Sequence, residues 1–129
     1  MSKLLKLLII DDSPRFRRAI KQVVNDLVSE IHEYSDGADA LTAYAAHRPD
    51  WVLMDIRMKK IDGLSATRQI KKSYPDALIA IISIGKDEAI REAALLAGAC
   101  AFIAKDNLFE LRNLLIENLE KPTKPTGLQ

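Results

Sequence analysis

The 129-residue chain has a single cysteine, Cys100, and no long run of apolar residues. One cysteine cannot form an intramolecular disulfide, which is typical of a protein from a reducing cytoplasm, the localisation that we predict. No apolar stretch approaches the roughly 18 residues that span a bilayer, so we expect no membrane partner. Charge of one sign is not in excess either, since 19 Lys and Arg stand against 18 Asp and Glu. We therefore expect no direct binding of nucleic acid by this domain, because such domains carry a broad basic surface.

The composition that is present is that of one folded domain. Apolar residues make up 48% of the chain and charged residues 29%, as in ordinary globular domains. A glycine-rich phosphate loop of either common type is lacking, which argues against a nucleotide enzyme. We expect the domain to cover residues 1–120. Residues 121–129 contain two prolines and are predicted to form a flexible tail or the start of a linker.

Short apolar runs alternate with longer amphipathic runs along the sequence. The apolar runs predict strands at residues 4–10, 31–34, 51–54, 78–82 and 101–103. Helical spacing between them predicts helices at about 14–27, 38–46, 63–73, 86–97 and 107–119. Strands that alternate with helices form parallel sheets, and strands that are apolar throughout belong to sheets covered on both faces. The prediction is an α/β fold, a doubly wound five-stranded parallel sheet with five helices.

Polar side chains follow four of the predicted strands. Asp11 and Asp12 follow the first, Asp55 the third and Ser83 the fourth, and Lys105 comes shortly after the fifth. Ligands bind beyond the carboxyl ends of such strands. Three neighbouring carboxylates repel one another unless a hard cation such as Mg²⁺ binds between them. An ammonium and a hydroxyl suit a phosphate, and a carboxylate can act as a nucleophile. The pattern therefore predicts metal-assisted phosphoryl transfer to an aspartate.

Each of these residues has a simpler explanation when it is taken alone. Aspartate and serine after a strand are common helix caps and turn residues. A single aspartate at a position such as that of Asp55 more often has a structural role than a functional one. Polar residues at four strand ends rarely occur together by chance, so the functional prediction rests on the whole set.

The motifs at these strand ends resemble the receiver domain of bacterial two-component response regulators. The resemblance covers about residues 5–119 and implies a flavodoxin-like fold with strand order 2-1-3-4-5. The segments that carry it are LIIDDS at 8–13, VLMDIRM at 52–58, IDG at 61–63, Ser83, LAGA at 96–99 and FIAK at 102–105. The Lys105-Asp106 pair further resembles receivers that precede a LuxR/NarL-type DNA-binding domain. Control of transcription through an output domain outside these 129 residues is thereby implied.

The resemblance implies a cofactor and a partner for the acidic residues. Asp55 would be the phosphoacceptor, taking its phosphoryl group from a sensor histidine kinase or a phosphotransfer protein. Asp12, Asp55 and the backbone carbonyl of Arg57 would hold Mg²⁺, with Asp11 acting partly through water. The chain would catalyse its own phosphorylation and dephosphorylation, yet it would be a switch and not a turnover enzyme.

The resemblance also implies how the switch would work. Ser83 and Lys105 would bind the phosphoryl oxygens, and Phe102 falls at the aromatic switch position of the family. Movement of the hydroxyl and the aromatic ring would remodel the face formed by helix four, strand five and helix five. A homodimer is also compatible with the resemblance, through helices one and five or through the helix-four face.

Two departures from the family pattern carry predictions of their own. Lys59-Lys60 replaces the usual Pro-Gly, so we expect a more mobile loop after Asp55. Ile84 replaces a small alanine and is expected to modulate access to Asp55 by narrowing it, which would slow phosphorylation, hydrolysis or both.

Two other hypotheses remain open from the sequence. The first is a protein-binding pseudo-receiver that works without phosphorylation, which the complete acid set disfavours. The second is a phosphatase that forms an aspartyl-phosphate. Such enzymes usually carry a second aspartate two residues beyond the nucleophile, where this chain has Arg57. His32 and His47 lie far apart in the sequence pattern and show no metal-ligand spacing.

Overall fold

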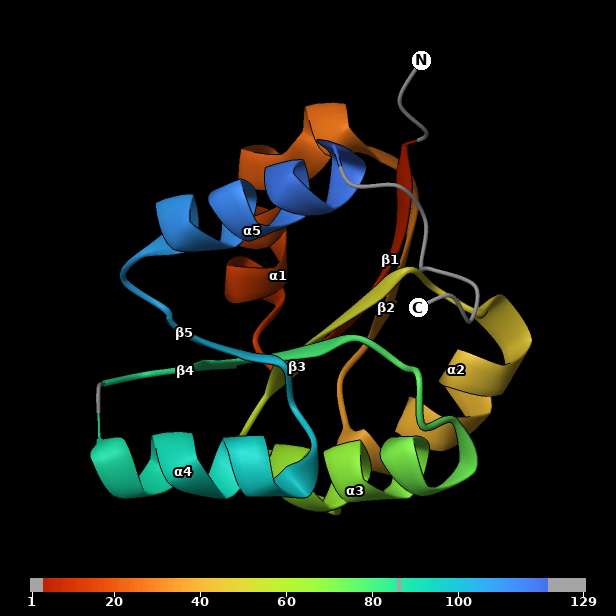
Figure 1. The fold of residues 1–129 in the computed structure, drawn as a ribbon, viewed down its shortest axis with the longest axis vertical. Helices are drawn as coiled ribbons and strands as arrows, with labels where there is room; N and C mark the ends of the chain where they lie inside the picture. The colour runs from red at the N-terminus through yellow and green to blue at the C-terminus, as the bar shows by residue number, and fades with distance from the viewer. Residues whose placement is uncertain (1–3, 86, 121–129) are drawn as a thin grey trace, which may run out of the picture.

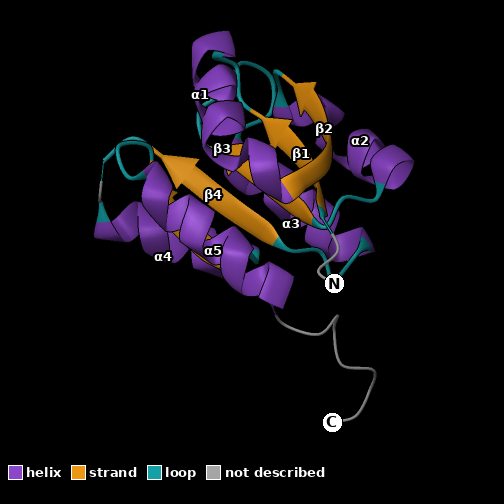
Figure 2. Cartoon of the chain, turned by 90° about the horizontal axis from the view of Figure 1, so that it is seen from above, coloured by secondary structure: helices purple, strands orange, loops and turns teal. Residues whose placement is uncertain are grey.

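The computed structural model describes residues 4–85 and 87–120 of the chain. Its strands form one parallel sheet in the order β2-β1-β3-β4-β5, and the arrowheads in Figure 2 point the same way. The predicted fold class and strand order are confirmed. The strands are β1 (Leu5–Ile10), β2 (Val28–Tyr34), β3 (Trp51–Asp55), β4 (Ile79–Ser83) and β5 (Ala101–Ala104).

Within residues 4–85 and 87–120, five α-helices cover the sheet on both faces. α1 and α5 lie on one face, and α2, α3 and α4 lie on the other (Figure 1). Among the described residues no helix is both long and apolar enough to cross a membrane. The helices are α1 (Pro14–Val24), α2 (Ala40–His47), α3 (Gly63–Ser73), α4 (Glu88–Ala97) and α5 (Leu108–Glu120), with 3₁₀ turns at Asn25–Leu27 and Gly37–Asp39.

The central strands are apolar throughout because alternate residues enter two different cores. In β1, Leu8 and Ile10 pack under α2, α3 and α4, whereas Leu7 and Ile9 pack under α1 and α5. All four side chains are fully buried. β3 and β4 follow the same alternation. A sheet covered on both faces requires this composition, so the uninterrupted apolar runs have a direct structural cause.

A pair of hydrogen bonds between Lys6 and Asp50 joins the start of β1 to the residue before β3. The N–H of Asp50 donates to the carbonyl of Lys6 at 2.8 Å. In return, the N–H of Lys6 donates to Oδ2 of Asp50, also at 2.8 Å. The two strands are therefore joined ahead of their ladder as well as along it.

The ends of the helices follow the capping chemistry of the sequence. The Ser13 hydroxyl accepts from the N–H of Phe16 at 3.1 Å, and Pro14 is the first helical residue of α1. Asp62 and Asp87 cap α3 and α4 in the same manner. Gly98 ends α4 with a left-handed φ of 111°, a conformation that costs glycine little. These caps place the loops that follow the strands.

The observed boundaries differ from the predicted ones in a few places. β2 begins three residues earlier than predicted, at Val28. Its first residues include exposed polar side chains, so the apolar run that predicts a strand starts only later. α1 ends at Val24 and tightens into a 3₁₀ turn through Leu27, a common end for a helix. The predicted tail at 121–129 lies outside the described residues.

Gly63 permits a close backbone approach next to the end of β3. Its N–H donates to the carbonyl of Ile56 at 2.7 Å. A Cβ atom at position 63 would lie 1.9 Å from the carbonyl oxygen of Asp55. Only a residue without a side chain fits there, so the first turn of α3 can rest directly on the Asp55–Ile56 peptide.

We expect Gly63→Ala to destabilise the fold by roughly 3 kcal/mol, the range of severe overpacking against backbone. The measurement is the midpoint of urea unfolding. Gln69→Ala, at an exposed position of the same helix, is the control and should stay within about 0.5 kcal/mol of wild type. Equal midpoints for wild type and Gly63→Ala would contradict this account.

Candidate functional site

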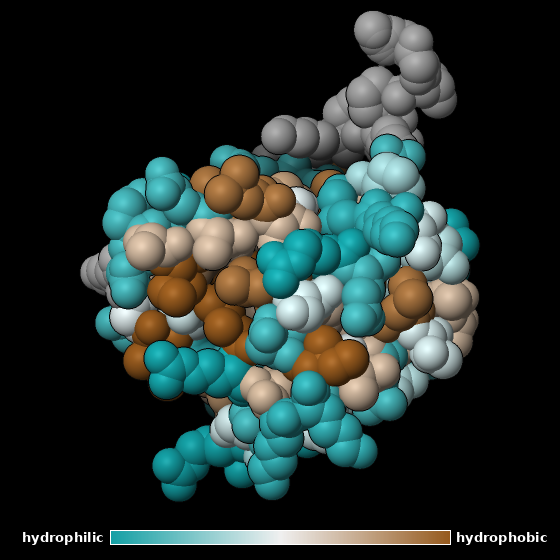
Figure 3. Space-filling model, turned by 90° about the horizontal axis from the view of Figure 1, so that it is seen from below, coloured by the Kyte–Doolittle hydropathy of each residue, from teal (hydrophilic) through white to brown (hydrophobic). Residues whose placement is uncertain are grey.

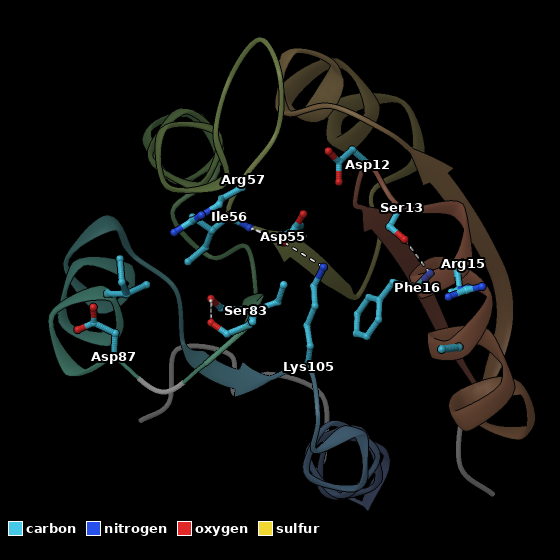
Figure 4. A pocket seen from close by; sticks show the side chains of 13 residues that line it. Asp12, Ser13, Arg15, Phe16, Asp55, Ile56, Arg57, Ser83, Asp87 and Lys105 are labelled. Atoms are coloured by element: carbon cyan, nitrogen blue, oxygen red, sulfur yellow. Dashed lines mark hydrogen bonds and ion pairs between the residues drawn. The ribbon is translucent and has the colours of Figure 1, made fainter.

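A pocket of about 820 Å³ opens beyond the carboxyl ends of the strands (Figure 4). Apolar side chains from α1, the loop after β3 and α4 line it together with charged ones. In Figure 4 the side chain of Lys105 extends toward Asp55, and Asp12 lies on the side of β1. Six of the predicted site residues line the pocket, namely Asp12, Asp55, Arg57, Ser83, Ile84 and Lys105.

The sheet register brings three carboxylates together at one end of this pocket. Ile10 of β1 pairs with Met54 of β3, so the residues that follow them, Asp11 and Asp55, leave adjacent strands at the same level. One carboxylate oxygen from each of Asp11, Asp12 and Asp55 lies within 4.8 Å of the others. Asp11 and Asp55 are buried, whereas Asp12 is exposed.

Lys105 is the positive charge that balances the two buried carboxylates. Its ammonium lies 3.0 Å from Oδ2 of Asp11 and 3.3 Å from Oδ1 of Asp55. Its backbone N–H donates to the carbonyl of Ser83 at 2.7 Å, which fixes the start of the side chain beside β4. The ammonium also lies 4.4 Å from the centre of the Phe16 ring, within the range of a cation–π contact.

The surroundings of Asp55 disfavour its negative charge. Burial and the neighbouring Asp11 carboxylate raise the pKa of Asp55, and the Lys105 ammonium and the N–H of Ile56 offset part of this rise. The Ile56 N–H donates to Oδ1 of Asp55 at 2.9 Å. A second cation next to Asp55 would relieve the repulsion between carboxylates.

The donor set of this site suits a hard divalent cation. Three carboxylates offer oxygen ligands within reach of one another, and one face of the group opens to the pocket at Asp12. Mg²⁺ prefers a few carboxylates with the remaining positions left to water and phosphate. Asp11 contributes one oxygen already engaged with the Ser13 N–H at 2.8 Å and another with Lys105. The residues present therefore fit such an ion.

The remaining predicted residues, Ser83, Ile84 and Phe102, differ in burial and in whether they line the pocket. Ser83 is buried, and its hydroxyl donates to the carbonyl of Ile84 at 3.2 Å. Ile84 lines the pocket, yet 83% of its surface is exposed. Phe102 is not among the lining residues; it packs, partly buried, against the core under α2, α3 and α4.

The loop after β3 contains Lys59-Lys60, from which the sequence predicts mobility. In the structure the backbone N–H groups of Lys60 and Ile61 donate to the carboxylate of Asp36 at 2.9 and 3.1 Å. Asp36 is absent from the predicted set. Its Asp-Gly sequence indicates a turn, and nothing local reveals a contact with residues 24 and 25 positions later.

The two histidines are neighbours in space, which corrects the interpretation from their distance in sequence. The rings of His32 and His47 stack with centroids 3.6 Å apart, because α2 packs next to the edge strand β2. Tyr34 Oη lies 2.9 Å from Nε2 of His47. Both histidines are outside the pocket lining, so this pair stands apart from the site.

Comparison with known proteins shows which family this sequence matches. The model of the response regulator receiver domain family matches residues 7–116. The chain is 37% identical over 122 residues to the chemotaxis protein CheY of Listeria monocytogenes, covering 94% of this chain and all of that protein. It is also 37% identical over 105 residues to the cyclic di-GMP phosphodiesterase response regulator RpfG of Xanthomonas campestris, covering 78% of this chain but 28% of RpfG.

A solved structure shows the same architecture. The signal receiver domain of the response regulator NarL from Mycobacterium tuberculosis superposes with a TM-score of 0.82 at 29% identity, covering 93% of this chain and 99% of that one. This likeness agrees with the Lys105-Asp106 motif. Several curated relatives are longer: the chain spans between about a quarter and a half of RpfG and of DegU from Brevibacillus brevis.

We expect Asp55→Asn to stabilise the metal-free protein by roughly 1 kcal/mol at neutral pH, because it removes a charge that burial disfavours. The folded-state pKa of Asp55 is raised. The free energy of unfolding of wild type is therefore highest below the unfolded-state pKa, where Asp55 is neutral in both states, and it falls as pH rises through the folded-state pKa. The advantage of the variant should therefore grow above about pH 4.

Urea unfolding in chelator at several pH values measures this difference. Asp39→Asn, which removes an exposed carboxylate from the same molecule, is the control and should show no such growth. A constant difference between Asp55→Asn and wild type at every pH would refute the assignment.

Proposed function

The chain belongs to the response regulator receiver domain family, and we propose that it accepts a phosphoryl group on Asp55 in a Mg²⁺-dependent step. The donor would be the phosphohistidine of a sensor kinase or of a phosphotransfer protein. The observation that carries the proposal is the contact of the Lys105 ammonium with both Asp55 and Asp11, since Asp55 and Lys105 line the pocket. We assign the receiver domain to residues 1–120.

Asp55 has one oxygen suited to attack. Its Oδ1 accepts from the Ile56 N–H and faces Lys105, so we assign Oδ2 as the nucleophile. An oxygen–phosphorus bond forms as the phosphorus–nitrogen bond of the donor breaks, and the electron pair of that bond stays on the imidazole nitrogen. The product is an aspartyl-phosphate, and the donor histidine is left unphosphorylated.

Mg²⁺, held by Asp11, Asp12, Asp55 and the backbone carbonyl of Arg57, would supply charge that offsets the phosphoryl oxygens. The donor chemistry of the carboxylate group supports this assignment. The protein itself keeps Asp55 buried and holds its Oδ1 with a backbone N–H. Both features orient the nucleophile before the donor arrives.

Lys105 and Ser83 are the groups proposed to bind the transferred phosphoryl oxygens. The Lys105 ammonium is already beside Asp55. The Ser83 hydroxyl now donates to the Ile84 carbonyl at 3.2 Å, and it would turn from that carbonyl to the phosphoryl group. That rotation is a small local event that can bias the packing of β4 against its neighbours.

The proposed output is a change of the face formed by α4, β5 and α5. Phe102 of β5, partly buried under α4, would turn further inward when Ser83 moves. This face carries exposed apolar side chains, of which Leu96 and Phe109 expose 88% and 76% of their surface. Figure 3 looks onto the layer of α2, α3 and α4 and shows apolar side chains gathered mainly on the side where α4 lies. Control of transcription through an output domain is the use that the likeness to the transcriptional regulatory protein DegU favours.

The deciding experiment is phosphate incorporation from acetyl phosphate. We expect one phosphoryl group per wild-type chain in Mg²⁺, none in chelator and none in Asp55→Asn. Asp39→Asn is the matched control, since it also loses one carboxylate but from an exposed position, and it should behave as wild type. Equal incorporation by Asp55→Asn would refute Asp55 as the phosphoacceptor, and no incorporation by wild type would support a pseudo-receiver that works without phosphorylation.

A second prediction concerns the rim of the pocket. Ile84 lines it with a bulky side chain, and we propose that this side chain restricts the approach of donors and of water to Asp55. Ile84→Ala should accelerate phosphorylation, hydrolysis or both by up to roughly tenfold, an effect of about 1.4 kcal/mol on the barrier. Leu4→Ala, at an exposed apolar residue outside the pocket, is the control. Unchanged rates in both directions would refute the role of Ile84.

A further inference from the structure

The loop between β3 and α3 is held from outside the pocket by one carboxylate. Asp36 follows β2 and accepts three backbone hydrogen bonds. Its Oδ1 accepts from the N–H groups of Ala38 and Ile61 at 2.8 and 3.1 Å, and its Oδ2 accepts from the N–H of Lys60 at 2.9 Å. One of these bonds caps its own turn, and the other two cross to a loop 24 and 25 residues later.

The residue after Asp36 fits tightly under the same loop. Gly37 is buried, and a Cβ atom there would lie 2.4 Å from the carbonyl oxygen of Ile61. The two loops therefore meet through backbone N–H groups that donate to the Asp36 side chain and through direct backbone packing at Gly37. Such a junction cannot shift without breaking polar contacts on both sides.

The other end of the loop is held by Gly63. Its N–H donates to the carbonyl of Ile56 at 2.7 Å, immediately after Asp55. Residues 57–62 are thus a short closed loop, fixed at its base by Gly63 and at its far side by Asp36. Arg57, whose backbone carbonyl is the proposed fourth metal ligand, lies between these two points of attachment.

We propose that Asp36 is a positioning residue for the phosphorylation site, holding the 57–62 loop so that the Arg57 carbonyl faces the three carboxylates. This inference rests on the proposed function, and it adds a residue that touches neither the phosphoryl group nor the ion. The hollow between the two loops is lined by both Asp36 and Asp12, so the attachment point borders the metal-binding carboxylates.

The charge of Asp36 strengthens this attachment. Its backbone hydrogen bonds, chiefly the one from Lys60, hold the pKa of Asp36 below its usual value. The side chain is therefore ionised at neutral pH, and hydrogen bonds to an ionised acceptor are about twice as strong as neutral ones. Substitution by asparagine can keep the two bonds to Oδ1 but places an N–H₂ group against the Lys60 N–H.

The test compares Asp36→Ala, Asp36→Asn and wild type with Glu92→Ala, which removes one negative charge from an exposed position of α4. Mg²⁺ binding to the unphosphorylated proteins is measured by calorimetry, and amide exchange of Lys60 and Ile61 is measured by NMR without metal. Asp36→Ala should weaken Mg²⁺ binding about tenfold, the usual effect of a supporting residue, and should speed exchange at both amides. Asp36→Asn should fall between it and wild type, and Glu92→Ala should match wild type.

Phosphorylation by acetyl phosphate separates the possible failures. If Asp36 positions the loop, Asp36→Ala will be slow at low Mg²⁺ and will recover most of its rate at saturating Mg²⁺. A purely structural role would lower the urea midpoint and leave the Mg²⁺ affinity of the folded protein unchanged, which overturns the inference. If Asp36→Ala does not fold, Asp36→Asn decides by the same comparison. Lack of Mg²⁺ binding or phosphorylation in wild type would instead refute the proposed function.

Discussion

Two buried carboxylates, Asp11 and Asp55, share the single ammonium group of Lys105, and the rest of the structure is built to make that contact possible. The carboxylates must leave adjacent strands at the same level, which the pairing of β1 with β3 provides. Lys105 must reach them from the far edge, across β4, where its backbone is tied to Ser83. Two apolar cores, one on each face, hold the strands in this arrangement. The energetic cost of crowded acidic groups is thus met by packing elsewhere in the domain.

Most of the fold could be predicted because its causes are local. Apolar runs and helical spacing report burial within one element, and the central strands and α3 obey that pattern closely. One geometric rule, that the carboxyl ends of parallel strands share an edge, predicted that Asp11 and Asp55 lie at one rim of the sheet, and the strand order implied by the family resemblance put their strands side by side. β2 obeyed the pattern least, because an edge strand is half exposed and its polar residues Ser29 and Glu30 conceal where it begins.

The features that could not be predicted join residues distant in the sequence. Three such contacts connect different elements: the hydrogen bond from the Lys60 N–H to Asp36, the stacking of His32 on His47, and the cation–π contact of Lys105 with Phe16. None has a signature in the residues around it. Lys59-Lys60 shows the same limit of local reasoning: the lack of Pro-Gly indicates flexibility locally, whereas two hydrogen bonds of this loop are accepted by a side chain on another loop.

The apolar character of β1 on both faces has one more consequence. In a half-exposed strand, a slip of one residue would move apolar side chains into water, and burial alone would prevent it. In β1 a slip would merely exchange Leu7 and Ile9 for Leu8 and Ile10, with little change in buried surface. The alignment of this strand must therefore be specified by polar groups at its ends, the reciprocal bonds of Lys6 with Asp50 and the pairing of Asp11 with Lys105. The same aspartate that serves the site also prevents a competing alignment of the chain.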